Sequence, residues 1–98
     1  MKDLEKEYVT RAKSEISEYY EEYSENLKEL KEMYNNGDIS SDSLDLMEDD
    51  AWNNLNSSVE FVMLNAVRRD CNIASLVEIG TEAGWTFEEV ENYLYNVR

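Results

Sequence analysis

The chain of 98 residues contains no proline, no histidine and a single cysteine, and glycine occurs at only three positions. With so little to interrupt the backbone, long helices are the expected structure. One cysteine, Cys71, excludes an internal disulfide and favours a reduced, cytoplasmic setting. We expect its thiol to be an unreactive part of a helix.

The sequence also lacks long apolar segments. Its first residues, MKDLE, do not form the apolar stretch of a secretory signal peptide. No segment approaches the ~20 apolar residues that a membrane-spanning helix needs. We therefore expect a soluble protein of the cytoplasm, which is the host-cell cytoplasm if the chain is encoded by a phage.

The same absences restrict catalysis. Without histidine, and without a glycine-rich phosphate loop, the usual combinations of nucleophile, base and phosphate-binding backbone are missing. Paired carboxylates cleave glycosidic bonds in some enzymes, but a helical protein of this size offers little cleft for a sugar. We expect no enzymatic activity, no catalytic residue and no cofactor.

Acidic side chains are abundant. The chain has 23 Asp and Glu residues against 9 Lys and Arg residues, which gives a formal net charge of −14. Most of the acids fall in three segments without any base, between Ser14 and Leu27, between Glu32 and Val67, and after Arg69 as far as Arg98. Such a surface repels nucleic acid and anionic membranes and attracts basic grooves. The expected partner is a strongly cationic protein, with no direct binding of nucleic acid or membrane.

Apolar residues at spacings of three and four predict an all-α fold in one domain, residues 1–98. The expected helices cover residues of about 3–34, 41–69, 73–83 and 87–96. Together they form a long antiparallel helical hairpin with two short helices packed at one end. The residues expected on the buried sides are Leu4, Tyr8, Ala12, Ile16, Tyr20, Tyr23, Leu27, Leu30 and Tyr34 in the first helix, Leu44, Met47, Ala51, Leu55, Val59, Val62 and Ala66 in the second, Ile73, Leu76, Val77 and Ile79 in the third, and Val90, Tyr93, Leu94 and Val97 in the fourth.

Capping residues support these boundaries. Residues 35–38, Asn-Asn-Gly-Asp, tolerate left-handed conformations and predict the hairpin turn. Ser40 or Ser41 can cap the second helix, and Asn72 can cap the third. Thr86 and Glu89 have the spacing of a capping box, which predicts the start of the last helix.

On a helical wheel, six glutamates of the first helix lie opposite its apolar side. They follow one another at intervals of three or four residues over ~25 Å of helix, and the lysines lie to the flank. A second acidic cluster is expected at the start of the second helix. The candidate partner-binding residues are therefore Glu15, Glu18, Glu22, Glu25, Glu29 and Glu32 together with Asp42, Asp45, Glu48, Asp49 and Asp50.

In the character of these two acidic groups, the chain resembles the small acidic helical proteins that phages carry to inhibit restriction enzymes and CRISPR effectors. The resemblance implies a protein-binding inhibitor that places carboxylates where a basic groove would receive nucleic-acid phosphates. It implies no role for any single residue, because those proteins share no sequence motif. It also leaves open inhibition by blocking a conformational change or by forcing dimerisation.

The tyrosines support a different function. Tyr8, Tyr19, Tyr20, Tyr23 and Tyr34 give the first helix a wide aromatic side, and tyrosine is suited to protein interfaces. These rings either pack in the core against the second helix or form a docking surface. In the second case the chain is a helical adaptor or a structural oligomer, and a homodimer is the expected assembly.

Two further resemblances fail on particular residues. Residues 32–39 are superficially similar to an EF-hand calcium loop, but Tyr34 replaces a carboxylate or amide ligand and Ser43 stands where the bidentate glutamate belongs. We expect no dedicated metal site. Residues 73–95 suggest a helix-turn-helix or a three-helix ubiquitin-binding module, but the last helix is acidic, which is the wrong sign for a DNA major groove. We interpret this segment as a packing module for the hairpin.

Overall fold

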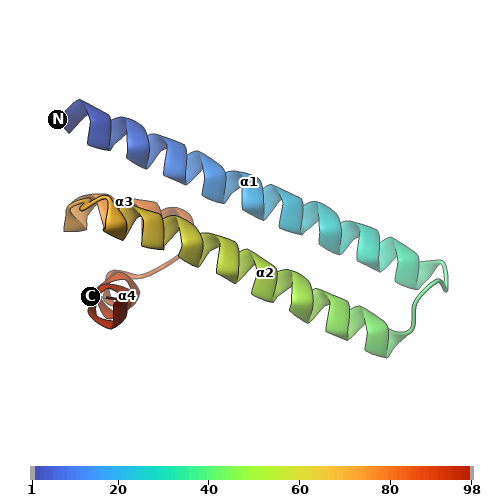
Figure 1. Ribbon diagram of the computed structural model, residues 1–98. Coiled ribbons are helices and arrows are strands. Elements are labelled where there is room, and N and C mark those ends of the chain that lie inside the picture. The colour runs from blue at the N-terminus through green and yellow to red at the C-terminus, as the bar shows by residue number, and fades with distance from the viewer. Residues whose placement is uncertain (1, 98) are drawn as a thin grey trace.

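A computed structural model describes residues 2–97, and in this range it contains four α-helices and no strand. The helices are α1 (Lys2–Asn35), α2 (Ser41–Arg68), α3 (Ile73–Glu82) and α4 (Phe87–Val97). The all-α prediction is confirmed. Figure 1 shows α1 and α2 as an antiparallel hairpin, with α3 and α4 beside the end that lies away from the hairpin turn. The molecule is elongated and measures 54 × 26 × 18 Å.

Helices α2, α3 and α4 begin at predicted caps, and of the two serines predicted for α2, Ser40 is the cap. The side chain of Ser40 accepts a hydrogen bond from a backbone N–H of the first turn of α2, and Asn72 does the same for α3. In the capping box of α4, the Glu89 N–H donates to Thr86 Oγ1 at 3.2 Å and the Thr86 N–H donates to Glu89 Oε1 at 3.1 Å. Each cap satisfies backbone donors that a helix leaves unpaired at its first turn.

Helices α1, α2 and α3 all end in the same hydrogen-bonded turn, the Schellman motif. At the end of α1, Gly37 has a φ of 81° and the Asp38 N–H donates to the Met33 carbonyl oxygen at 2.8 Å. Gly84 takes the corresponding left-handed position after α3, with a φ of 76°. After α2 that position belongs to Asp70, with a φ of 57°, although a side chain makes this conformation costly.

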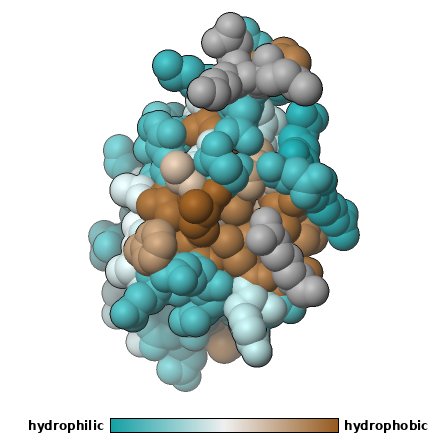
Figure 2. Space-filling view, turned by 90° about the vertical axis from the view of Figure 1, so that its left-hand side faces the viewer, coloured by the Kyte–Doolittle hydropathy of each residue, from teal (hydrophilic) through white to brown (hydrophobic). Residues whose placement is uncertain are grey.

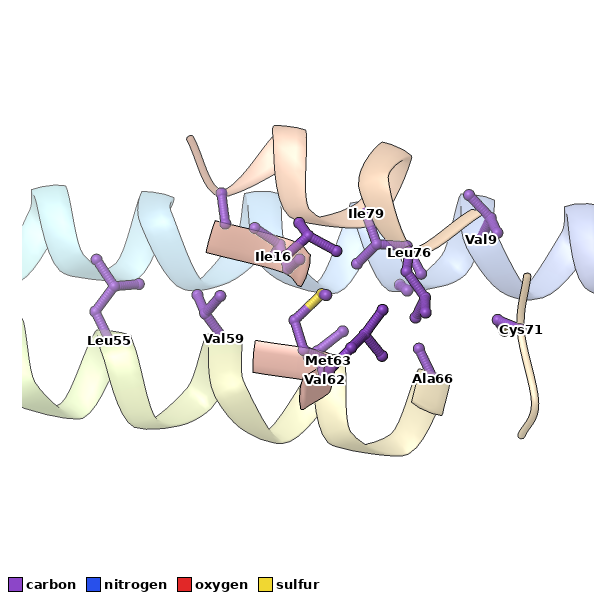
Figure 3. Packing of buried hydrophobic residues seen from close by; sticks show 14 residues of the cluster. Val9, Ile16, Leu55, Val59, Val62, Met63, Ala66, Cys71, Leu76 and Ile79 are labelled. Carbon is purple, nitrogen blue, oxygen red and sulfur yellow. The ribbon is translucent and has the colours of Figure 1, made fainter. Parts of the chain in front are cut away.

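The core lies in the half of the hairpin that carries α3 and α4. Figure 3 shows Ile16 of α1, Met63 of α2 and Ile79 of α3 converging, and each of these residues is completely buried. Val90 of α4 is also completely buried. A methyl group built on Gly80 of α3 would lie 2.7 Å from the Val90 Cγ2 atom, so the absence of a side chain at residue 80 allows α4 to approach α3 closely.

Polar contacts fix α3 along α1. The Glu5 carboxylate of α1 accepts hydrogen bonds from the Asn72 N–H at 3.3 Å, from Asn72 Nδ2 at 2.8 Å and from Ser75 Oγ at 3.0 Å. At the other end of α3, the Tyr20 hydroxyl donates to the Ala83 carbonyl oxygen at 3.0 Å. These bonds position α3 at both of its ends.

Several residues predicted to be buried are exposed, so this part of the prediction was wrong. They lie within the first two turns or the last turn of their helices, and they are Leu4, Tyr34, Met47, Ile73 and Val97. Val9, which was not expected in the core, is buried. Cys71 is buried as well, but it lies in the connection between α2 and α3 and not on a helix as expected.

Candidate functional site

The six glutamates of α1 form an exposed line on the side of the helix that faces away from the core. We call this line the glutamate stripe. All six side chains are exposed, whereas Ile16 and Leu30, on the opposite side of the same helix, are buried. The stripe consists of Glu15, Glu18, Glu22, Glu25, Glu29 and Glu32.

The stripe carboxylates are not neutralised by ion pairs with described side chains. Within residues 4–97, the one salt bridge joins Lys13 and Glu78 at 3.3 Å, and neither residue belongs to the stripe. Lys28 and Lys31 of α1 form no salt bridge with the stripe. In the part of the chain that the structure describes, the six glutamates also take part in no hydrogen bond through their side chains. Their negative charges are therefore directed to solvent and to any molecule that approaches this face.

The spacing of the stripe suits contact with a cationic surface. The six carboxylates are separated by five intervals over ~25 Å of helix, so each charge occupies about 5 Å of the axis. One strand of B-DNA carries a phosphate for about every 3.4 Å. The stripe thus has about two thirds of the linear charge density of one DNA strand.

The second acidic group, Asp42, Asp45, Glu48, Asp49 and Asp50, does not form one line, because only Asp42, Asp45 and Asp49 share a face of α2. We call it the α2 cluster. Successive helical residues differ by about 100°, so Glu48, Asp49 and Asp50 point in three directions. Glu48 is half-buried on the side of α2 that also carries Ala51 and Leu55, while Asp50 is exposed. Because the stripe faces away from α2, the structure does not unite the two acidic groups into one face.

The tyrosines expected on a docking surface mostly belong to the core. Tyr8, Tyr19, Tyr20 and Tyr23 are partly buried and pack against the core cluster, whereas Tyr34 is 44% exposed. The Tyr23 ring also packs against the Trp52 ring of α2, with a centroid distance of 5.8 Å. The aromatic side of α1 is therefore used largely inside the molecule.

Other side chains that could carry chemistry are enclosed or dispersed. Cys71 is 3% exposed, and its burial, followed by the nearby charge of Glu5, raises the pKa of the thiol, which favours the protonated and less reactive form. Among the described residues, no three Cys, Asp or Glu side chains come together as a metal site would require. Helices in the described range are too short or too polar to cross a membrane. The acidic face of α1 is the arrangement with the clearest binding chemistry.

An apolar area that was not predicted from the sequence lies at the end of the molecule formed by α3, α4 and the start of α1. Figure 2 views this end and shows apolar side chains gathered at its centre, bordered by hydrophilic ones. Large apolar side chains that this half of the chain exposes include Phe61, Ile73 and Phe87. Phe61 stands next to buried Val62 in an apolar run, residues 61–64 (Phe-Val-Met-Leu). In such a run, apolar periodicity does not indicate which side chain is exposed.

No protein-family model matches the sequence, and no match is found among curated proteins or among solved structures.

Proposed function

We propose that this chain is a non-enzymatic inhibitor that binds a basic nucleic-acid-binding groove of another protein. A CRISPR effector or a restriction enzyme is the proposed target, and a phage-type anti-defence role follows from that choice. The observation that carries the proposal is the glutamate stripe, with six exposed carboxylates in line along α1 and without a base paired to them among the described side chains.

The physical basis is competition for the same cations. A groove that binds nucleic acid offers Lys and Arg side chains to a row of phosphates, and binding releases counterions. RNA-guided nucleases hold their heteroduplex in a positively charged channel, which is a groove of this kind. A rigid helix that presents carboxylates about 5 Å apart can occupy such a groove without being a substrate. The net charge of −14 adds long-range attraction to a basic partner.

The alternative function, an adaptor or oligomer that binds through its tyrosines, has weaker support. Four of the five tyrosines on α1 pack against the core cluster. Their rings are partly buried against apolar neighbours, so together they do not form the wide docking surface that this function needs.

A displacement experiment tests the proposed function. Purified RNA-guided nucleases and restriction enzymes are each loaded with fluorescently labelled DNA, and the protein is added while anisotropy is recorded. Phosphate mimicry predicts competitive release of DNA from at least one target, with an affinity that falls steeply as salt rises. Six phosphate-like contacts would give a slope of log affinity against log salt of about −5. Inhibition that does not compete with DNA, or that is indifferent to salt, would exclude this mechanism.

A further inference from the structure

A groove lies between α1 and α2 on one flank of the hairpin, next to the glutamate stripe. It has a volume of about 300 Å³, and its α1 side consists of Tyr19, Glu22, Tyr23 and Asn26. Asn54 of α2 contributes to the opposite side. Glu22 therefore belongs both to the stripe and to the groove.

The groove exists because this part of the hairpin is lined by short side chains of α2. Ala51 and Ser58 leave space between the helices that larger residues would fill, and Ala51 is buried at its base. The aromatic wall is held in place, because Tyr23 packs against Trp52 with a centroid distance of 5.8 Å. Figure 1 shows α3 and α4 beside the end of the hairpin that lies away from the turn, whereas the groove residues lie near the middle of α1 and α2. The groove is thus preformed and open to a partner.

The chemistry of the lining fits a guanidinium group. Glu22 supplies a carboxylate, Asn26 and Asn54 supply amide oxygens, and Tyr19 and Tyr23 supply aromatic surface, while no base lines the groove. An arginine side chain has a planar array of five N–H donors that can bond a carboxylate in a bidentate manner and can stack on an aromatic ring. The lysine ammonium is a compact and strongly hydrated charge, so it uses the aromatic surface less well.

We propose that this groove receives an arginine side chain of the basic partner, with Glu22 as the ionic contact and the two tyrosines as the stacking surface. The proposal rests on the proposed function, because it takes the partner to be a basic protein bound along the stripe. It adds a specific point of recognition to an otherwise general electrostatic attraction. It also predicts that the partner residue that enters this groove is an arginine and not a lysine.

A titration with small cationic probes tests the groove without the partner. N-acetylarginine methylamide and its lysine counterpart are added to isotopically labelled protein at low salt, and the side-chain amide signals of Asn26, Asn54 and Asn53 are followed by NMR. Asn53 is the internal control, because it neighbours Asn54 in sequence but does not line the groove. We expect saturable shifts at Asn26 and Asn54 with the arginine probe, at least about fivefold tighter than with the lysine probe. Equal responses to the two probes would overturn the proposal.

Matched variants sharpen the result. Asn54→Trp, which fills the groove, should remove saturable arginine binding, whereas Asn53→Trp should not. Glu22→Gln should weaken the arginine probe about fivefold, and Glu18→Gln, in the stripe but outside the groove, less than about twofold. Identical behaviour within either pair would contradict an arginine site.

The two proposals fail in different ways. If the probes show no arginine site while DNA displacement still depends on the stripe, the groove proposal is wrong and phosphate mimicry stands. If DNA displacement fails while the arginine probe binds at Asn54, phosphate mimicry is wrong and the groove remains a site for an arginine from another source.

Discussion

Glu18→Lys should make the isolated protein more stable, even though it removes part of the proposed binding surface. Glu18 is exposed and has acidic neighbours three or four residues away on α1, namely Glu15, Glu21 and Glu22, and no base at these spacings. Each like-charged pair at such spacing destabilises a helix by about 0.2–0.5 kcal/mol, and an opposite pair stabilises it by a similar amount. Reversing one charge converts three repulsive pairs into attractive ones. The expected gain in the free energy of unfolding is about 1–3 kcal/mol.

Thermal unfolding followed by circular dichroism measures this gain. For a domain of this size, about 1–3 kcal/mol corresponds to a rise in Tm of about 5–20 °C at low salt. Glu60→Lys is the matched control, because it changes the net charge equally but has no charged residue three or four positions away. The difference between the two variants should shrink at about 0.5 M salt, where the screening length falls to a few ångströms. If Glu18→Lys is no more stable than Glu60→Lys at low salt, the stripe is not a site of local repulsion.

Three further predictions concern the fold. Gly80→Ala should lower the free energy of unfolding by about 1 kcal/mol, because overpacking against Val90 outweighs the gain in helix propensity. In urea denaturation, Val90→Ala should lower the free energy of unfolding less in this variant than in the parent, and an equal loss would contradict the contact. Asp70→Gly should raise the Tm through a gain of about 1 kcal/mol, since glycine accepts the left-handed backbone after α2, and an unchanged or lower Tm would contradict this reason. Glu5→Ala should speed hydrogen exchange in α3 through a loss of about 1–2 kcal/mol, and exchange as slow as in the parent would show that these bonds do not hold α3.

Much of the helical architecture could be predicted because it depends on local chemistry. Asn72 and the pair of Thr86 and Glu89 were predicted as caps from their side chains and their positions before apolar segments, and the structure confirms them. For the second helix the prediction left Ser40 and Ser41 as alternatives, and the structure shows Ser40 as the cap. The boundaries of all four helices differ from expectation by at most one residue. The spacing of three and four residues likewise identified Ile16 and Leu30 as buried.

The remaining features depend on contacts between distant segments. The role of Gly80 in the approach of α4 to α3 could not be predicted, because it depends on the position of Val90 in space. Met47 continues the apolar pattern of α2, yet it is 40% exposed because this part of α2 lies outside the core. Glu5 reaches residues far along the chain, and no sequence pattern indicates that pairing.

The candidate site also combines features that could be predicted from the sequence with features that could not. The alignment of the glutamate stripe follows from helical periodicity and could be predicted from α1 alone. The same periodicity directs the acids of the α2 cluster to different sides of the helix. This could have been predicted, but the acids were taken as one group because they are close together in the sequence. The groove beside Glu22 could not be predicted, because it requires the relative placement of Tyr19 on α1 and Asn54 on α2.

A comparison of two charge-reversed variants tests phosphate mimicry most directly. Each variant changes three exposed acids to lysine and shifts the net charge from −14 to −8, since three reversals add 6 charge units. The first is altered in the stripe, at Glu18, Glu22 and Glu25, and the second in the α2 cluster, at Asp45, Asp49 and Asp50. Far-UV circular dichroism checks that both remain helical, as expected for exposed positions.

The measurement is the displacement of labelled DNA from the target by each variant, over a range of salt concentrations. Phosphate mimicry predicts that the stripe variant loses displacement, while the α2 cluster variant keeps most of it. Where residual binding of the stripe variant can be measured, the slope of log affinity against log salt should flatten by about 2.7, a little under one unit for each lost contact. If both variants displace DNA at the strength of the parent protein, phosphate mimicry is wrong, and the apolar end around α3 and α4 becomes the leading candidate for the binding surface.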